Sequence, residues 1–172
     1  AWTSFTNSRK NWAYRQDQLP STHPIAADNY DLRAVEANFD GITYAKGASS
    51  LKQLVAWVGE EDFFAGLRTY FDKHAFGNTE LSDLLTELEA ASGRELREWA
   101  AEWLQTSGVN TLRAAFETSE EGEFTSFSVE QTAIEAYPTL RRHRIAIGLY
   151  GLVDGRLTRT HRVETDITGA ST

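Results

Sequence analysis

The sequence predicts an α+β fold, with helices first and antiparallel strands after them. Up to about residue 108, apolar residues recur three and four positions apart, which is the spacing of an amphipathic helix. From Val109 the pattern changes to alternation with β-branched and aromatic residues, which favours strands. We therefore expect two domains, a helical one over residues 1–108 and a β domain over residues 109–172.

The helical elements follow from apolar stripes and from the residues that end them. Residues 1–19 read as an amphipathic helix that ends before Pro20, and residues 31–39 as a short helix with Leu32, Val35 and Phe39 facing inward. Four helices with short links should follow and form a bundle-like array. Their expected core positions are Leu51, Leu54, Val55 and Val58; Phe63, Leu67, Tyr70 and Phe71; Leu81, Leu84, Leu85 and Leu88; and Leu96, Trp99, Ala100 and Trp103.

Helix ends are also marked in this region. Gly59, Gly77, Ser92-Gly93 and Gly108 stand where helices should stop, and Thr79 is the expected cap of the helix that follows it.

Four strands are expected in the β domain, over residues 111–117, 124–132, 142–151 and 156–167. Asp154-Gly155 is typical of a tight hairpin between the last two. We expect this domain to be truncated, so that a sheet edge is exposed and could pair with a second copy of the chain.

Composition restricts the classes of function. Of 172 residues, 17 are basic and 25 are acidic, and a net charge of -8 argues against nucleic acid and anionic membranes as partners. There is no cysteine, which fits a reducing cytoplasm. No apolar run is long enough to span a membrane, and the first residues lack the pattern of a signal peptide. The absence of any methionine suggests an internal fragment of a longer polypeptide.

The stretch from Phe39 to Leu51 holds the main candidate for chemistry. Asp40-Gly41 should form a turn, with Gly41 allowing a positive φ, and a helix should begin directly after it. Tyr44 then lies in the first helical turn, capped by Asp40 or Thr43, where backbone N–H groups and a phenol would together favour an anion or a developing oxyanion. Taken alone, a tyrosine at such a position is more often a packing residue.

The run Phe-Asp-x-Ile-Thr-Tyr-x-Lys-Gly-Ala resembles the tyrosine motif of the zinc aminopeptidases of the aminopeptidase N family, the gluzincins. The resemblance continues at residues 21–25, 51–70, 77–79, 103–105 and 108–109. It implies the helical half of a thermolysin-like catalytic domain followed by a small β-sandwich. It also implies peptides as substrates, zinc as cofactor, and Tyr44 as the donor of a hydrogen bond to the tetrahedral oxyanion.

The chain has no zinc-binding motif of its own. A zincin needs two histidines four residues apart on one helix, with a glutamate beside the first, but the four histidines here are scattered and none precedes a glutamate. The resemblance places the zinc ligands ahead of Ala1, so the fragment alone should bind no catalytic zinc and hydrolyse no peptide. A non-enzymatic peptide or protein interaction module and a pseudo-enzyme without its ligands remain alternatives.

The other polar candidates have plain structural interpretations. We expect His23 to be structural in the connector after Pro20 and Lys46 to lie on the surface, with a contact to substrate as the alternative for each. His74 should complement a helix end. The carboxylates of residues 60–62 should favour a helix start. The cluster at residues 141–144 should be a solvated strand start, and His143 and His161 should lie on a surface or sheet face.

Overall fold

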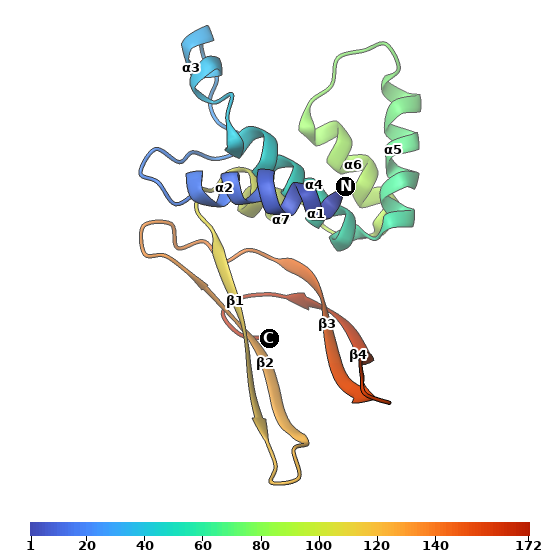
Figure 1. The fold of residues 1–172 in the computed structure, drawn as a ribbon. Helices are drawn as coiled ribbons and strands as arrows, with labels where there is room; N and C mark the ends of the chain where they lie inside the picture. The colour runs from blue at the N-terminus through green and yellow to red at the C-terminus, as the bar shows by residue number, and fades with distance from the viewer.

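The computed structural model describes all of residues 1–172, and its helices come before its strands (Figure 1). A continuous N-terminal helix consists of α1 (Trp2–Phe5), the π-helical turn η1 (Thr6–Lys10) and α2 (Asn11–Gln16). The strands form two separate two-stranded antiparallel sheets. The predicted α+β class is confirmed, whereas the division into domains at residue 108 stays a prediction.

Six further helical segments follow along the chain. They are α3 (Leu32–Ala37), the π-helical turn η2 (Ile42–Lys46), α4 (Gly47–Val58), α5 (Glu60–His74), α6 (Leu81–Ser92) and α7 (Arg97–Leu104). η2 runs directly into α4, so Tyr44 lies at the start of one long helix. None of these helices is both long enough and apolar enough to cross a membrane.

The hydrophobic core lies where α4, α6 and α7 meet, with Phe63 of α5 packed against it. The predicted stripes supply most of it, but Leu51 is 53% exposed, and Trp57 takes part although it lies outside the stripe. The large indole of Trp57 is buried in place of Leu51, and burying it removes more apolar area from water. The buried members are Leu54, Trp57, Val58, Leu85, Leu88, Leu96, Trp99 and Ala100.

Two helix ends agree with the glycine signals, whereas Gly77 and Gly108 follow helices that have already ended at His74 and Leu104, and one cap differs. Gly59 (φ +94°) and Gly93 (φ +66°) end α4 and α6 in conformations that favour glycine. The cap of α6 is Glu80 rather than the predicted Thr79, because Glu80 and Asp83 satisfy each other's backbone N–H groups. Thr79 instead shares a hydrogen bond of 2.6 Å with the hydroxyl of Tyr70.

The predicted inward face of α3 is wrong. Leu32, Val35 and Phe39 are 80%, 41% and 67% exposed, and α3 points away from the other helices (Figure 1). This helix has only six residues and is started locally, by the carboxylate of Asp31 accepting from the N–H of Ala34 at 2.7 Å. The apolar pattern therefore does not report burial within this chain.

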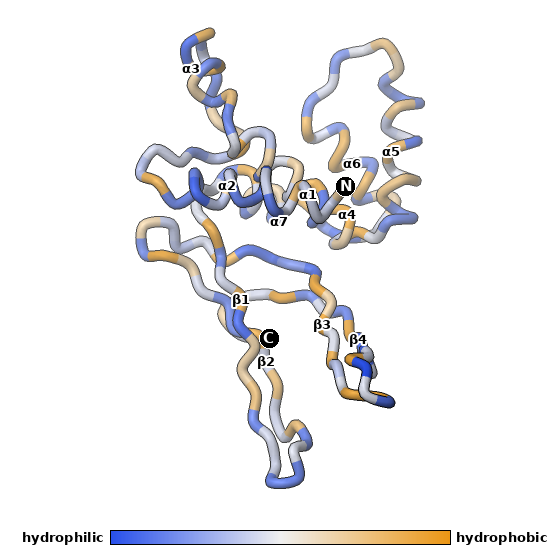
Figure 2. Tube along the Cα trace, viewed as in Figure 1, coloured by the Kyte–Doolittle hydropathy of each residue, from blue (hydrophilic) through white to orange (hydrophobic).

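The four strands confirm the sequence prediction to within about two residues, the accuracy usual for element ends. They are β1 (Asn110–Thr118), β2 (Phe124–Ala133), β3 (His143–Val153) and β4 (Arg156–Ile167). Asp154 and Gly155 both have positive φ, as the predicted hairpin requires. Along both hairpins hydrophobic and hydrophilic residues alternate (Figure 2), and the chain end returns to β2, where Val129 and Thr172 exchange backbone hydrogen bonds.

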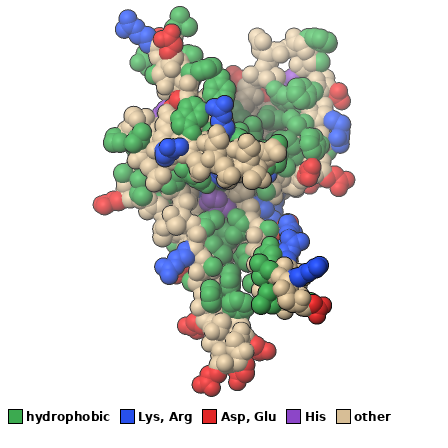
Figure 3. Space-filling model, in the orientation of Figure 1, with side chains coloured by type: hydrophobic (Ala, Val, Ile, Leu, Met, Phe, Trp, Pro, Cys, Tyr) green, Lys and Arg blue, Asp and Glu red, His purple; other side chains and the backbone are tan.

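The hairpins carry apolar side chains that stay partly exposed. Phe116, Phe124 and Phe127 form an aromatic cluster with ring centroids 5.3 to 6.3 Å apart, and each is at least 40% exposed. Green side chains accordingly cover much of the visible strand surface (Figure 3). The helical core is thus the better-packed part of the molecule.

Gly66 tests how tightly α5 and α6 are packed. An added Cβ at Gly66 would meet the carbonyl oxygen of Glu87 and Leu88 Cδ2, both at 2.9 Å, so Gly66→Ala should lower the free energy of unfolding by about 1–2 kcal/mol despite the better helix propensity of alanine. Gly47→Ala is the matched control, because a Cβ there meets nothing closer than 3.9 Å. Urea unfolding of both variants should show a loss for the first and none for the second.

Candidate active site around Tyr44

Tyr44 presents its phenol to solvent at the start of the α4 helix. Its side chain is 53% exposed, and no group of the chain hydrogen-bonds to the hydroxyl. The ring is held edge-on against Phe39, with centroids 4.9 Å apart at 75°. The phenol is therefore oriented by an aromatic contact and keeps its hydroxyl free to bind a ligand.

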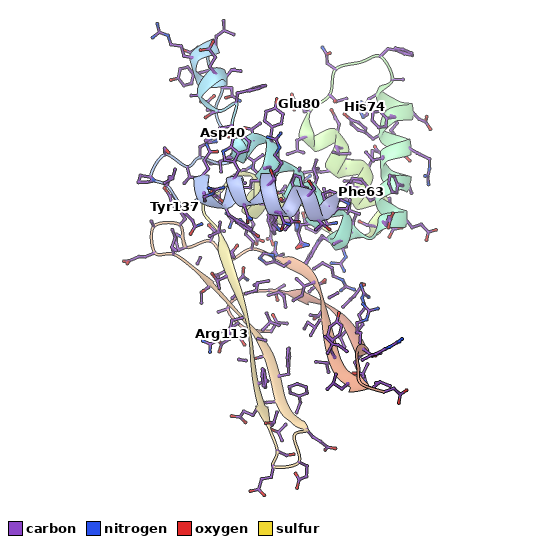
Figure 4. The ribbon with its side chains drawn as sticks, in the orientation of Figure 1. Asp40, Phe63, His74, Glu80, Arg113 and Tyr137 are labelled. Carbon is purple, nitrogen blue, oxygen red and sulfur yellow. The ribbon has the colours of Figure 1, made fainter.

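The carboxylate of Asp40 caps the turn that carries Tyr44. Its Oδ1 accepts from the backbone N–H of Ile42 at 2.8 Å and of Thr43 at 3.1 Å, and its backbone oxygen accepts from the N–H of Tyr44 at 3.1 Å. Of the two predicted caps, Asp40 holds this position, and the hydroxyl of Thr43 bonds to the carbonyl of Asn38 instead. Asp40 appears at the base of α3 in Figure 4.

The end of α2 and the connector hold Asp40 and Gly41 from the other side. Gln16 donates to Oδ2 of Asp40 and accepts from the N–H of Gly41 at 2.9 Å, while His23 Nε2 lies 2.9 Å from the same Oδ2. Gly41 has a helical φ of -65°, so the positive φ that glycine allows is not used here. Glycine is required by close approach, because a Cβ would stand 2.7 Å from Gln16 and 3.0 Å from Trp12.

An open hollow of about 700 Å³ lies next to this turn. Phe39 and Asp40 form one side of it, and Arg9, Arg15 and Trp12 contribute to the other. Ligand sites are usually concave, and this hollow shares Phe39 and Asp40 with the turn, although Tyr44 itself does not line it.

Lys46 is buried, which corrects the prediction of a surface position. Only 8% exposed, it forms an ion pair with Asp17 at 2.8 Å and donates to the carbonyls of Thr106 and Gly108 at 3.2 and 3.5 Å. Burial lowers the pKa of the Lys46 ammonium, and the bond to Asp17 offsets part of that shift. The residue fixes the end of the Tyr44 turn to α2 and to the loop after α7.

Within the basic cluster at residues 141–144, Arg141 is buried rather than solvated as predicted, whereas Arg142 and Arg144 stay partly exposed. Arg141 is 3% exposed and binds the loop after α7, donating to Thr106 Oγ1 at 2.7 Å, the Ser107 carbonyl at 2.9 Å and Asn110 Oδ1 at 2.9 Å. A guanidinium offers five donors in a rigid plane, which suits a site lined with carbonyls. Arg141 thereby joins the helices to the strands.

His143, expected on a surface or a sheet face, is the first residue of β3 and faces the same junction, where it is only partly exposed. Its ring packs edge-on against Trp103, with centroids 5.0 Å apart, and Nε2 lies 3.2 Å from Oε1 of Gln131. Burial and the charge of Arg141 lower the pKa of His143 to about 4. These residues and Lys46 face a cavity of about 560 Å³ between the helices and the strands.

Within residues 1–172 the structure brings no three histidine, cysteine, aspartate or glutamate side chains together in a group that could hold a metal ion. His23 is bound to Asp40, His74 packs near Tyr70, and His161 is exposed on β4. The side chains of this chain therefore do not fit a zinc site.

Comparison with known proteins identifies the family. Residues 1–103 match the profile described as the Peptidase family M1 domain. The chain belongs to peptidase family M1.

Several relatives show how widely this family segment occurs. Aminopeptidase N of Streptomyces lividans is 59% identical over 179 residues, which cover all of this chain and 21% of that protein. The Tricorn protease-interacting factor F2 of Thermoplasma volcanium is 38% identical over 112 residues, or 65% of this chain and 14% of that protein. This chain thus spans 21% of the length of the Streptomyces lividans protein and 14% of the length of the Thermoplasma volcanium protein.

A solved structure shows the same fold. The crystal structure of Legionella pneumophila aminopeptidase A in complex with aspartic acid matches with a TM-score of 0.63, covering 80% of this chain and 15% of that one at 17% identity. The M1 family and the α+β fold are therefore both established for this chain.

The ion pair of Lys46 provides a test of the junction. Lys46→Met keeps the apolar stem but leaves Asp17 buried without its cation, so the free energy of unfolding should fall by about 3–5 kcal/mol. Arg68→Met, at an exposed position of α5, should change it by less than about 0.5 kcal/mol. Equal unfolding curves for Lys46→Met and the parent would show that the pair does not support the fold.

The lowered pKa of His143 predicts that the free energy of unfolding falls in acid. Its pKa is about 4 in the folded chain against 6.5 unfolded, so between these values only the unfolded state takes up the proton and stability falls as pH falls. His143→Gln should remove about 3 kcal/mol of that acid-dependent loss. Urea unfolding at pH 7 and pH 4 measures it, with the exposed His161→Gln as control; identical pH dependence in His143→Gln would refute the assignment.

Proposed function

We propose that this chain is part of a zinc-dependent aminopeptidase that removes N-terminal residues from peptides, and that Tyr44 stabilises the oxyanion. The observation that carries the proposal is the exposed phenol at a capped helix start, with its hydroxyl unbonded within the chain. Membership of family M1 and the aminopeptidase names of several relatives support a peptidase.

The role of Tyr44 follows from the charge that develops in peptide hydrolysis. Attack on the scissile carbonyl turns its oxygen into an oxyanion, and a donor already aimed at that point stabilises the transition state without reorganisation. The phenol O–H is such a donor, and Phe39 holds its ring in place. Zinc would be held in the complete enzyme by groups outside residues 1–172, so the part proposed for these residues is to place the phenol.

A non-enzymatic interaction module is the competing proposal. The partly exposed aromatic cluster of β1 and β2 would suit a protein partner. Membership of family M1 and the capped turn that presents the Tyr44 phenol favour the enzyme.

Replacement of Tyr44 tests this function. In a chimera of the Streptomyces lividans aminopeptidase N whose matching segment is replaced by residues 1–172, Tyr44→Phe should lower kcat on an aminoacyl nitroanilide by about 10²- to 10³-fold, the usual effect of losing one oxyanion donor. Bound zinc, measured by atomic absorption, should stay unchanged.

Tyr30→Phe is the matched control, because Tyr30 is 81% exposed and stands outside the Tyr44 turn. The 172-residue chain alone, which we propose to be inactive, sets the baseline. A kcat for Tyr44→Phe near that of the parent chimera would remove Tyr44 from the mechanism.

A further inference from the structure

We propose that His23 and Asp40 are positioning residues for Tyr44, acting as a brace that fixes where the phenol points. This inference rests on the proposed function of Tyr44 and extends it to side chains that do not touch substrate. The brace consists of the His23 imidazole, the Asp40 carboxylate and the backbone of the turn that begins at Gly41.

Asp40 links the two halves of the brace because its oxygens have different partners. Oδ1 accepts from the N–H groups of Ile42 and Thr43, and Oδ2 accepts from His23 and Gln16. The first pair fixes the start of the turn, and the second fixes the carboxylate against the connector and α2. Rotation of the carboxylate would break both sets, so Asp40 is held in one orientation.

The imidazole of His23 is fixed by contacts at both of its ring nitrogens. Nε2 lies 2.9 Å from Asp40 Oδ2, Nδ1 lies 2.7 Å from the carbonyl oxygen of Pro24, and the two side chains are only 16% and 14% exposed. Both neighbours are acceptors, so each ring nitrogen faces an oxygen to which it can donate. The imidazole therefore ties the connector after α2 to the turn that presents Tyr44.

The brace reaches Tyr44 through one backbone hydrogen bond and one aromatic contact. The N–H of Tyr44 donates to the backbone oxygen of Asp40 at 3.1 Å, and Phe39, the residue before Asp40, packs on the tyrosine ring. A change in the direction of Asp40 thus moves both the backbone and the aromatic support of Tyr44. A displacement near 1 Å at a reacting group can cost about 10²-fold in rate.

A double-mutant cycle separates this role from a general structural one. In the same chimera, His23→Ala and Asp40→Asn should each lower kcat by about 10- to 100-fold with KM changed less than about 3-fold, because the phenol is misaimed while other substrate contacts remain. Asp40→Asn keeps an oxygen for the turn but sets an amide against the donors of His23 and Gln16. In the Tyr44→Phe background neither change should lower kcat further.

Two controls keep the result interpretable. His161→Ala removes an exposed histidine on β4 and should leave kcat unchanged in both backgrounds. His23→Gln replaces the ring with a smaller donor if His23→Ala does not fold, and a thermal unfolding curve is recorded for every variant.

The outcomes are distinct. The brace would be overturned if His23→Ala or Asp40→Asn lowered kcat fully in both backgrounds, or did not lower it in the parent background. In either case, a loss of kcat in Tyr44→Phe would still uphold the proposed function. No loss in Tyr44→Phe itself would overturn the proposed function and the brace together.

Discussion

The carboxylate of Asp17 is the constraint on which the arrangement of this molecule depends. It is 2% exposed and binds the ammonium of Lys46 at 2.8 Å, the N–H of Gly108 at 2.9 Å and the hydroxyl of Thr22 at 2.7 Å. A buried carboxylate is costly unless every lone pair finds a donor, so these three segments must converge. The end of α2, the Tyr44 turn and the α7–β1 loop are therefore fixed to one point.

The position of Tyr44 follows from that convergence. Lys46 draws the end of the π-helical turn inward, while Asp40 holds its start against Gln16 and His23. A π-helical turn spreads its side chains more widely than an α-helical one, and such turns occur often at functional sites. Tyr44 is left on the outer side of a turn that is anchored at both ends.

The sequence predicted the fold class, the four strands and most helix ends, because these depend on local pattern. Apolar spacing located Leu54, Leu88 and Trp99 in the core, and glycines marked the ends at Gly59 and Gly93. It also directed attention to Tyr44, although a motif alone does not reveal whether a phenol is exposed.

What the sequence could not predict were the long-range contacts of polar residues. Lys46 and Arg141 looked like surface cations, since burial of a charge depends on partners 29 or more positions away, Asp17 for one and the α7–β1 loop for the other. The contacts of His143 are of the same long-range kind, because Trp103 and Gln131 approach it from other elements. The one local hint was that a charged residue two positions after Tyr44 interrupts an otherwise apolar turn.

The hydrogen bonds of Arg141 to the loop after α7 restrict how the helices and the strands can move relative to one another. The guanidinium binds the carbonyls of Ser107 and Thr106, and Lys46 binds those of Thr106 and Gly108, so three consecutive carbonyls between the helices and the strands are bound within the protein. The helices and the strands cannot rotate relative to one another about a segment bound in this way. The two halves of the molecule should tumble together, with one rotational correlation time, and a force on either hairpin would be transmitted to the helix that bears the phenol.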